Sequence, residues 1–163
     1  MGEGHEIKCS KCGNEYTVFT GIGFAFPIVY EETVEKIRDG EYGEDLKNLF
    51  LSKPHLAVNC ENDLFVCVCG YWETEENLDI YEPIEEDLKR KRESAGDIHG
   101  YVMWEDLKKD YKLIRHHVHI CPECGKEMKR IKRPDYYVRK YGLKCPECGT
   151  KNKAGYETRI LWD

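Results

Sequence analysis

The chain has 163 residues, of which 40% are hydrophobic and 34% are charged, and its mean hydropathy is −0.68. Lys and Arg number 25 against 31 Asp and Glu, so the formal net charge is −6. This composition argues against one large apolar core, the 12% of aromatic residues argues against disorder, and no apolar run approaches the roughly 20 residues of a membrane span.

Cysteine content is the main clue to function. Residues Met1 to Glu6 show neither the basic start nor the apolar stretch of a signal peptide, so we expect a cytoplasmic location. In a reducing compartment, nine cysteines indicate metal binding rather than a disulfide framework.

The charges are distributed unevenly along the chain. Residues 107–163 carry 15 Lys and Arg against 7 Asp and Glu, whereas residues 1–106 carry 10 against 24. Such an asymmetry is typical of two modules with different partners, and it predicts a basic C-terminal module.

Elements of the first half follow from turn residues and apolar spacing. A glycine-rich apolar loop leads to Pro27, Gly40 is a helix stop, and Gly70 marks a turn between strands. The patterns predict strands at residues 5–9, 15–19 and 63–68, and helices at residues 31–39 and 44–51.

The second half begins with a charged segment. Residues 74–100 have few apolar anchors and opposed charge blocks, so we interpret them as a solvated helix or a disordered linker. The basic run Lys89 to Arg92 follows several acidic residues and is explained better by a solvated helix face than by a nucleic-acid patch. Beyond it, the pattern predicts a helix at residues 104–111 and strands at residues 112–120, 126–132 and 156–161.

Two near-identical motifs run from Cys121 to Gly125 and from Cys145 to Gly149. The 20 residues between the two cysteine pairs match the spacing of a structural zinc site. In such a turn both thiolates face one ion at about 2.3 Å, and the following glycine supplies the positive φ that the turn needs. We therefore predict a zinc site at Cys121, Cys124, Cys145 and Cys148.

This arrangement resembles the zinc-ribbon family, over about the last 50 residues of the chain. The resemblance implies two β-hairpins around a four-thiolate zinc, in a family that includes transcription factors, ribosomal proteins and protein adaptors. Rubredoxins, which hold a redox iron in Cys-Pro-x-Cys-Gly turns, are similar as well. The charged loop at residues 130–140 favours zinc over iron.

A less regular set of cysteines lies in the first half. Cys9 and Cys12 form an ordinary pair, whereas a single residue separates Cys67 from Cys69. We predict that these four thiols form a second zinc site across 54 intervening residues, so that the chain binds two Zn²⁺ ions.

Cys60 competes with Cys67 and Cys69 for two ligand positions. We interpret Cys60 as a small buried hydrophobe, and the glycine after Cys69 favours the Cys67 and Cys69 pair as ligands. Residues 9–73 also resemble the N-terminal part of small uncharacterised bacterial zinc-ribbon proteins, a resemblance that implies no known activity.

The motifs do not favour catalysis. Four thiolates would close both proposed sites, whereas a catalytic zinc keeps an open position. His116, His117 and His119 are similar to the His-rich pairs of some metal-dependent nucleases, but surface or aromatic-packed histidines explain them better. The alternative to a non-catalytic protein is therefore a metal-dependent enzyme or electron carrier, either a His-cluster nuclease or a rubredoxin-like iron protein.

Cations and tyrosines alternate between the last two cysteine pairs. Such a mixture is typical of surfaces that bind single-stranded nucleic acid, while the three tyrosines could equally form the small core of a ribbon. The candidate nucleic-acid-binding residues are Arg130, Lys132, Arg133, Arg139 and Lys140.

The sequence thus predicts a small metal-stabilised α+β protein built from two zinc ribbons. The expected parts are an N-terminal ribbon with a short helical insertion at residues 1–80, a charged linker at residues 81–106 and a basic C-terminal ribbon at residues 107–163. The expected function is that of a zinc-binding, non-catalytic interaction module whose C-terminal ribbon contacts nucleic acid or an acidic protein, without a membrane partner.

Overall fold

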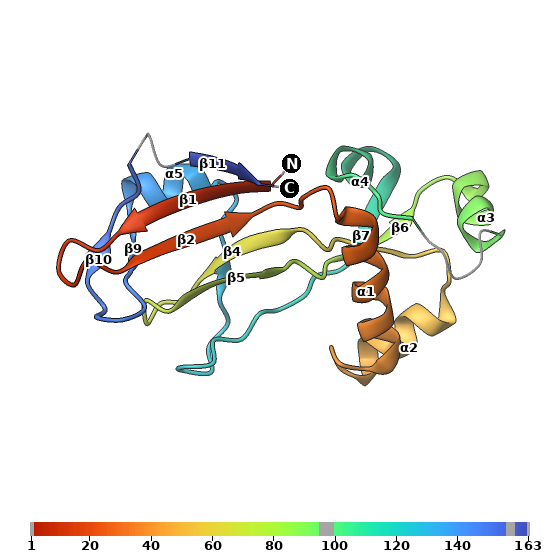
Figure 1. Ribbon diagram of the computed structural model, residues 1–163. Helices are drawn as coiled ribbons and strands as arrows, with labels where there is room; N and C mark the ends of the chain where they lie inside the picture. Colours follow the sequence, from red (N-terminus) through yellow and green to blue (C-terminus); the bar gives the residue numbers. More distant parts are fainter. Residues whose placement is uncertain (1, 95–99, 156–158, 163) are drawn as a thin grey trace. The chain divides into compact units, whose positions relative to one another are not determined.

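A computed structural model describes residues 2–94, 100–155 and 159–162 (Figure 1). In this part of the chain, five helices and several small antiparallel sheets form a small α+β protein. None of the helices there combines the length and the apolar character that a membrane crossing requires.

Two compact units alternate along the sequence. Unit 1 comprises residues 1–23, 61–76 and 118–163, and unit 2 comprises residues 24–60 and 77–117. These units cross the boundaries expected at residues 80 and 106, because strand pairing joins segments that lie far apart in the chain. Each unit is therefore discontinuous, and the expected order of ribbon, linker and ribbon is corrected.

A three-stranded sheet in unit 1 joins both ends of the chain. Strands β1 (Gly2–Lys8) and β2 (Glu15–Thr20) form the expected hairpin, and β11 (Arg159–Trp162) pairs with the other edge of β1. The register pairs Gly2 with Trp162 and Ile7 with Tyr16. Of the strand expected at residues 156–161, residues 156–158 lie outside the described part of the chain.

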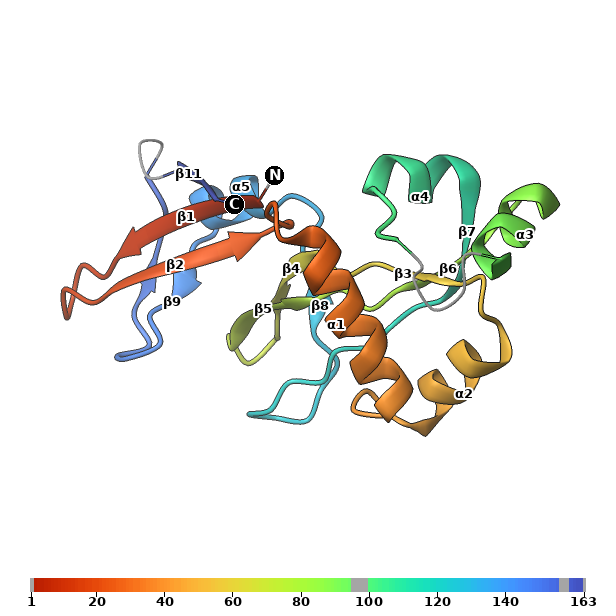
Figure 2. The same cartoon turned by 45° about the vertical axis from the view of Figure 1, so that its right-hand side comes forward.

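A second sheet of unit 1 has strand β4 at its centre. Its order is β5 (Trp72–Glu76), β4 (Asn62–Val66) and β8 (Lys129–Arg130), and Figure 2 shows these strands side by side. The pair β9 (Leu143–Lys144) and β10 (Lys151–Asn152) forms a third, two-stranded sheet. Because Val66 pairs with Lys129, the turn after β4 is held close to the segment before β8.

One apolar cluster holds unit 1 together. Helix α5 (Pro134–Lys140) contributes Val138, which is fully buried, while Tyr137 packs against the cluster from its edge. Burying such side chains stabilises a fold by about 1.5–3 kcal/mol each, and this core is small. Its buried members are Ile7, Val18, Leu64, Ile131, Val138, Leu143 and Ala154.

Unit 2 holds the remaining helices and one sheet. The helices are α1 (Phe26–Asp39), α2 (Glu44–Ser52), α3 (Glu86–Ser94) and α4 (Trp104–Asp110), and the sheet order is β3 (Ala57–Val58), β6 (Ile80–Pro83) and β7 (Tyr111–Arg115). The expected helices are confirmed. However, α1 begins five residues earlier than expected, because proline is well suited to a first helical turn and Pro27 occupies it.

Residues expected to form a linker are integral to unit 2. All four residues of β6 are buried, and β6 pairs with both β3 and β7. On α3, Lys89 and Arg90 form ion pairs with acidic residues one turn earlier, at 2.8 and 2.6 Å, as a solvated face would. Arg92 differs from them, because its side chain is only 9% exposed.

Arg92 docks α3 onto unit 2 through hydrogen bonds rather than apolar contacts. Its guanidinium donates to the carbonyls of His55 and Leu56 at 2.9 and 3.1 Å, and to the hydroxyls of Tyr30 and Tyr111 at 3.1 and 3.4 Å. The planar guanidinium carries five donors, which suits it to several acceptors at once. A helix with almost no apolar residues is thereby fixed to α1 and β7.

A second polar cluster surrounds Glu82 on β6. Its carboxylate lies 3.0 Å from the ammonium of Lys112, 3.1 Å from Nε2 of His55 and 3.4 Å from the ammonium of Lys53. The hydrogen bonds with Lys112 and His55 lower the pKa of Glu82 to about 2. This buried strand residue therefore stays ionised at neutral pH.

Candidate metal centres

Eight of the nine cysteines lie in four turns that share one backbone pattern. In each turn the amide of the first cysteine donates to a carbonyl beyond the glycine at 2.8 Å, and the glycine amide donates back to that cysteine's carbonyl. The expected positive φ is confirmed at all four glycines: Gly13 (77°), Gly70 (92°), Gly125 (69°) and Gly149 (71°).

The turn with a single spacer residue achieves the same closure with one residue fewer. Strand β4 ends at Val66, so Cys67 and Cys69 do not lie in a regular strand, where they would be about 6.5–7 Å apart. The amide of Gly70 donates to the carbonyl of Cys67 at 2.9 Å, and the amide of Cys67 donates to the carbonyl of Tyr71 at 2.8 Å. Both thiols can therefore point to one side of the turn.

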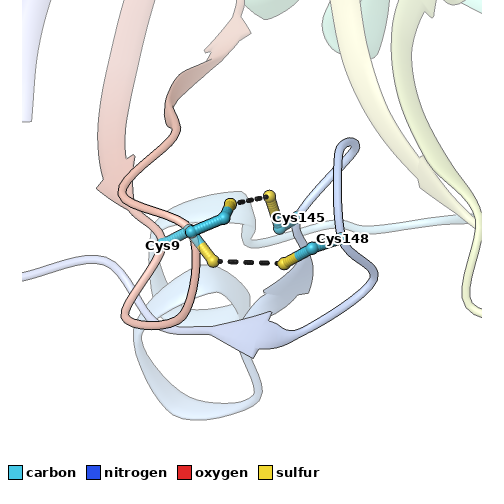
Figure 3. A group of neighbouring side chains, drawn as sticks. Cys9, Cys145 and Cys148 are labelled. Carbon is cyan, nitrogen blue, oxygen red and sulfur yellow. Dashed lines mark hydrogen bonds between the residues drawn. The ribbon is translucent and has the colours of Figure 1, made fainter.

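Two groups of four thiols form within unit 1, and in each the sulfur atoms all lie within 4.8 Å of one another. The first group brings the β1–β2 turn to the β9–β10 turn, and Figure 3 shows the sulfur of Cys9 opposite that of Cys148, at 3.5 Å. The groups are Cys9, Cys12, Cys145 and Cys148, and Cys67, Cys69, Cys121 and Cys124.

This pairing corrects the sequential one. The sequence favoured joining Cys9 and Cys12 to Cys67 and Cys69, and joining the last two pairs to each other; the structure instead nests one group within the other. The physical reason is that β4 pairs with β8, which carries the turn at residues 67–70 to the turn at residues 121–125.

Polar contacts hold the first group's two turns together in a similar way. The side-chain oxygen of Asn152 accepts from the amide and the hydroxyl of Ser10 at 2.9 and 3.0 Å. The hydroxyl of Tyr16 donates to the carbonyl of Leu143 at 3.2 Å. Sequence reasoning missed these residues because no motif marks a contact between residues more than a hundred positions apart.

Cys60 lies outside both groups. It belongs to unit 2 and is 1% exposed. The cysteines at positions 67 and 69, rather than Cys60, thus complete the four-thiol group.

The sulfur positions fit a tetrahedral ion. Four sulfurs at about 2.3 Å from a zinc are about 3.8 Å apart along each tetrahedron edge. The sulfur separations across the turns are 3.5 and 3.7 Å in the first group and 3.3 and 3.7 Å in the second. These distances are far above the roughly 2.05 Å of a disulfide. Each group could therefore hold one metal ion.

The local hydrogen bonds favour the thiolate that a metal needs. Backbone amides in the turns lower the pKa of Cys9 to about 6 and that of Cys69 to about 7. In contrast, the pKa of Cys12 is raised to about 12, because burial and the adjacent thiols outweigh a hydrogen bond from the Asn14 backbone. A group that holds its first thiolate resists forming the others unless a cation balances their charge.

Lys144 connects the two groups. Its ammonium donates to the carbonyl of Cys69 at 2.7 Å, while its own carbonyl accepts from the indole of Trp72 at 2.7 Å. A Cβ on Gly70 would overlap the Lys144 side chain, so only glycine allows this approach. Because Lys144 directly precedes Cys145, the turn of one group supports the strand leading into the other.

The histidines lie outside both four-thiol groups. Nδ1 of His116 and the backbone amide of His117 both lie 2.9 Å from the carboxylate of Asp79. The ring of His119 stacks on Phe65 with centroids 3.7 Å apart, in agreement with the aromatic-packed interpretation.

The predicted basic residues separate into two kinds. Arg130 lies on β8, and its Nε is 2.7 Å from the carboxylate of Asp63 on β4, so it serves the sheet. Lys132 is exposed in the segment before α5. The other three line a hollow of about 450 Å³ on α5 with Asp135 and Tyr136; they are Arg133, Arg139 and Lys140.

Comparison with known proteins finds no matching family, no similar curated protein and no similar solved structure. The fold and the two sites therefore define the class by themselves. The chain is a small α+β protein with two interleaved four-thiol groups, each able to hold a metal ion.

Proposed function

We propose that the protein is a non-catalytic zinc-binding module of the reducing cytoplasm that carries two structural Zn²⁺ ions and contacts nucleic acid. The observation that carries the metal assignment is the pair of four-thiol groups with tetrahedral sulfur spacing. Cys₄ sites of this kind are typical of structural zinc, and the turns match those of zinc ribbons locally. The nested pairing sets the chain apart from a pair of sequential ribbons.

The chain's own residues explain how such sites would act. Zinc supplies a charge that balances the thiolates and crosslinks turns from distant segments. Backbone amides in the turns donate to the sulfurs, and Asn14 directs its side-chain amide toward Cys145 Sγ at 3.9 Å. With four protein ligands no position is open for a water, which is the reason to favour a structural over a catalytic role.

Metal analysis of the purified protein tests this assignment. We expect two zinc ions per chain and a colourless protein, because each group offers four thiolates to one ion. Removing both with a chelator should unfold unit 1, since metal-binding energy and folding energy are the same quantity in such small domains. A red protein with stoichiometric iron would support the rubredoxin-like alternative, and a single zinc would contradict the two-site assignment.

The nucleic-acid proposal rests on a local concentration of cations. Whole units are not basic: unit 1 carries 13 Lys and Arg against 14 Asp and Glu, and unit 2 carries 12 against 17. The sequence's basic C-terminal half is thus divided between the two units. The basic segment, residues 126–144, nevertheless carries eight Lys and Arg against two acids and surrounds α5. Such a segment can neutralise phosphates.

Salt dependence measures this contact. We expect a single-stranded oligonucleotide to bind with an affinity that falls steeply with salt, and replacement of Arg133, Arg139 and Lys140 by Gln to flatten the log–log slope by up to about 2. The matched control replaces Lys89, Arg90 and Lys91 on α3 by Gln, which changes the net charge equally. If both triple variants lose affinity to the same extent, the contact is with overall charge and not with α5.

A further inference from the structure

The outer face of α5 combines aromatic rings with cations. Arg133, Tyr136 and Lys140 are spaced three and four residues apart and so share one face of the helix, while Val138 is buried on the other. Tyr136 is 44% exposed, and Tyr141, just beyond the helix, is 46% exposed. The expectation that the tyrosines form the core therefore applies to Tyr137, which packs against the unit 1 cluster, and not to its two neighbours.

The rings and cations hold one another in place. The Tyr136 and Tyr141 rings meet edge to face, with centroids 6.3 Å apart and planes at 81°. The Lys140 ammonium donates to the Tyr136 hydroxyl at 2.6 Å and lies 5.1 and 5.2 Å from the two ring centroids. The Arg133 guanidinium lies 5.4 Å from the Tyr136 ring. Such an arrangement restricts the rings before any ligand arrives, which lowers the entropy lost on binding.

We propose that this face, defined by Arg133, Tyr136, Lys140 and Tyr141, binds unpaired bases of a single-stranded nucleic acid, DNA or RNA, by stacking on the exposed tyrosine rings. This inference rests on the proposed nucleic-acid contact and specifies its ligand as single-stranded. Stacking needs a base with an exposed face, and in a duplex both faces of each base are covered by its neighbours.

The hollow beside Tyr136 supplies the second half of such a site. Its volume of about 450 Å³ lies within the roughly 300–1,000 Å³ of small-molecule pockets, so it is large enough for a nucleotide. Three of its five lining side chains are cationic, against the single carboxylate of Asp135. The hydrogen bond with Tyr136 raises the pKa of Lys140, which keeps its charge. A phosphate in the hollow would place its base near the ring.

The test compares four fluorescein-labelled probes of equal length: oligo-dT, oligo-rU, an abasic single strand and a dA·dT duplex. With the full-length zinc-loaded protein, we expect both base-bearing single strands to bind more tightly than the abasic strand or the duplex. Tyr136→Ala should weaken oligo-dT binding by roughly 5- to 150-fold, the range for loss of one stacked base. The same change should leave binding to the abasic strand nearly unaltered, because that strand has no base to stack.

Two further variants separate stacking from other effects. Tyr136→Phe keeps the ring and removes only the hydroxyl, so it should retain most of the affinity. Phe24→Ala removes a ring that is 69% exposed in unit 2, outside the basic segment, and should have no effect.

Each remaining outcome is informative. Equal affinity for oligo-dT and the abasic strand, with unchanged salt dependence, would overturn base stacking while the nucleic-acid contact stands. No binding of any probe at low salt would overturn the nucleic-acid contact as well. Polyglutamate that displaces oligo-dT at equal charge concentration would indicate an acidic protein as the ligand. A preference between oligo-dT and oligo-rU would identify DNA or RNA as the source of the strand.

Discussion

Replacing Cys12 and Cys145 together by Ser is expected to leave one tightly held zinc per chain, whereas replacing Cys12 and Cys69 together is expected to leave none. The first pair of changes removes two ligands from a single group, and the second removes one ligand from each group. Four-thiolate zinc sites contribute apparent free energies of about 10–16 kcal/mol at neutral pH, so a damaged site should lose its ion to a chelator. Zinc per chain after chelator treatment and gel filtration is the measurement.

These two double variants are matched, because each contains Cys12→Ser and one further cysteine change. The sequential pairing predicts the reverse result, with one zinc left when Cys12 and Cys69 are replaced and none when Cys12 and Cys145 are replaced. Cobalt substitution gives an independent readout, since only an intact four-thiolate site shows a tetrahedral absorption spectrum at full intensity. Cys60→Ser, a change outside both groups, should retain two ions.

Arg92→Ala is expected to destabilise unit 2 by about 3 kcal/mol. The change removes a buried guanidinium and leaves the carbonyls of His55 and Leu56 without their charged donor. Because α3 has almost no apolar residues with which to dock, the helix should separate from the unit before the remainder unfolds. Hydrogen exchange at the amides of α3 and β6 measures this local opening more directly than a global melting curve.

Lys91→Ala is the control for this prediction. Lys91 is the exposed neighbour of Arg92 on the same helix, so its removal should change stability by no more than about 0.5 kcal/mol. Arg92→Lys should be intermediate, because an ammonium keeps the charge but cannot reach four acceptors in one plane. Equal exchange rates in Arg92→Ala and Lys91→Ala would show that the buried guanidinium does not hold α3 in place.

Local features of this chain could be predicted from the sequence because each depends on neighbouring residues. The β1–β2 hairpin, helices α1, α2 and α4, and the positive φ of the glycine that ends each cysteine turn all follow from spacing and turn chemistry. The same holds for the turn at Cys67, where Gly70 marked a break in the strand. The charged segment at residues 81–106 could not be placed, because its attachment through Arg92 and Glu82 uses partners from other segments.

The sequence by itself determined that eight cysteines lie in four metal-binding turns, and only the tertiary structure decided which turns share an ion. Sequential pairing would close gaps of 54 and 20 residues, against 132 and 51 for the nested pairing. Because loop-closure entropy grows only with the logarithm of length, each longer gap costs only about 0.8 kcal/mol more. That difference is small beside the β4–β8 pairing, the buried core of unit 1 and the contacts of Asn152, all of which favour the nested arrangement. Spacing along the chain is therefore a weak guide to partnership, because packing between distant segments outweighs it.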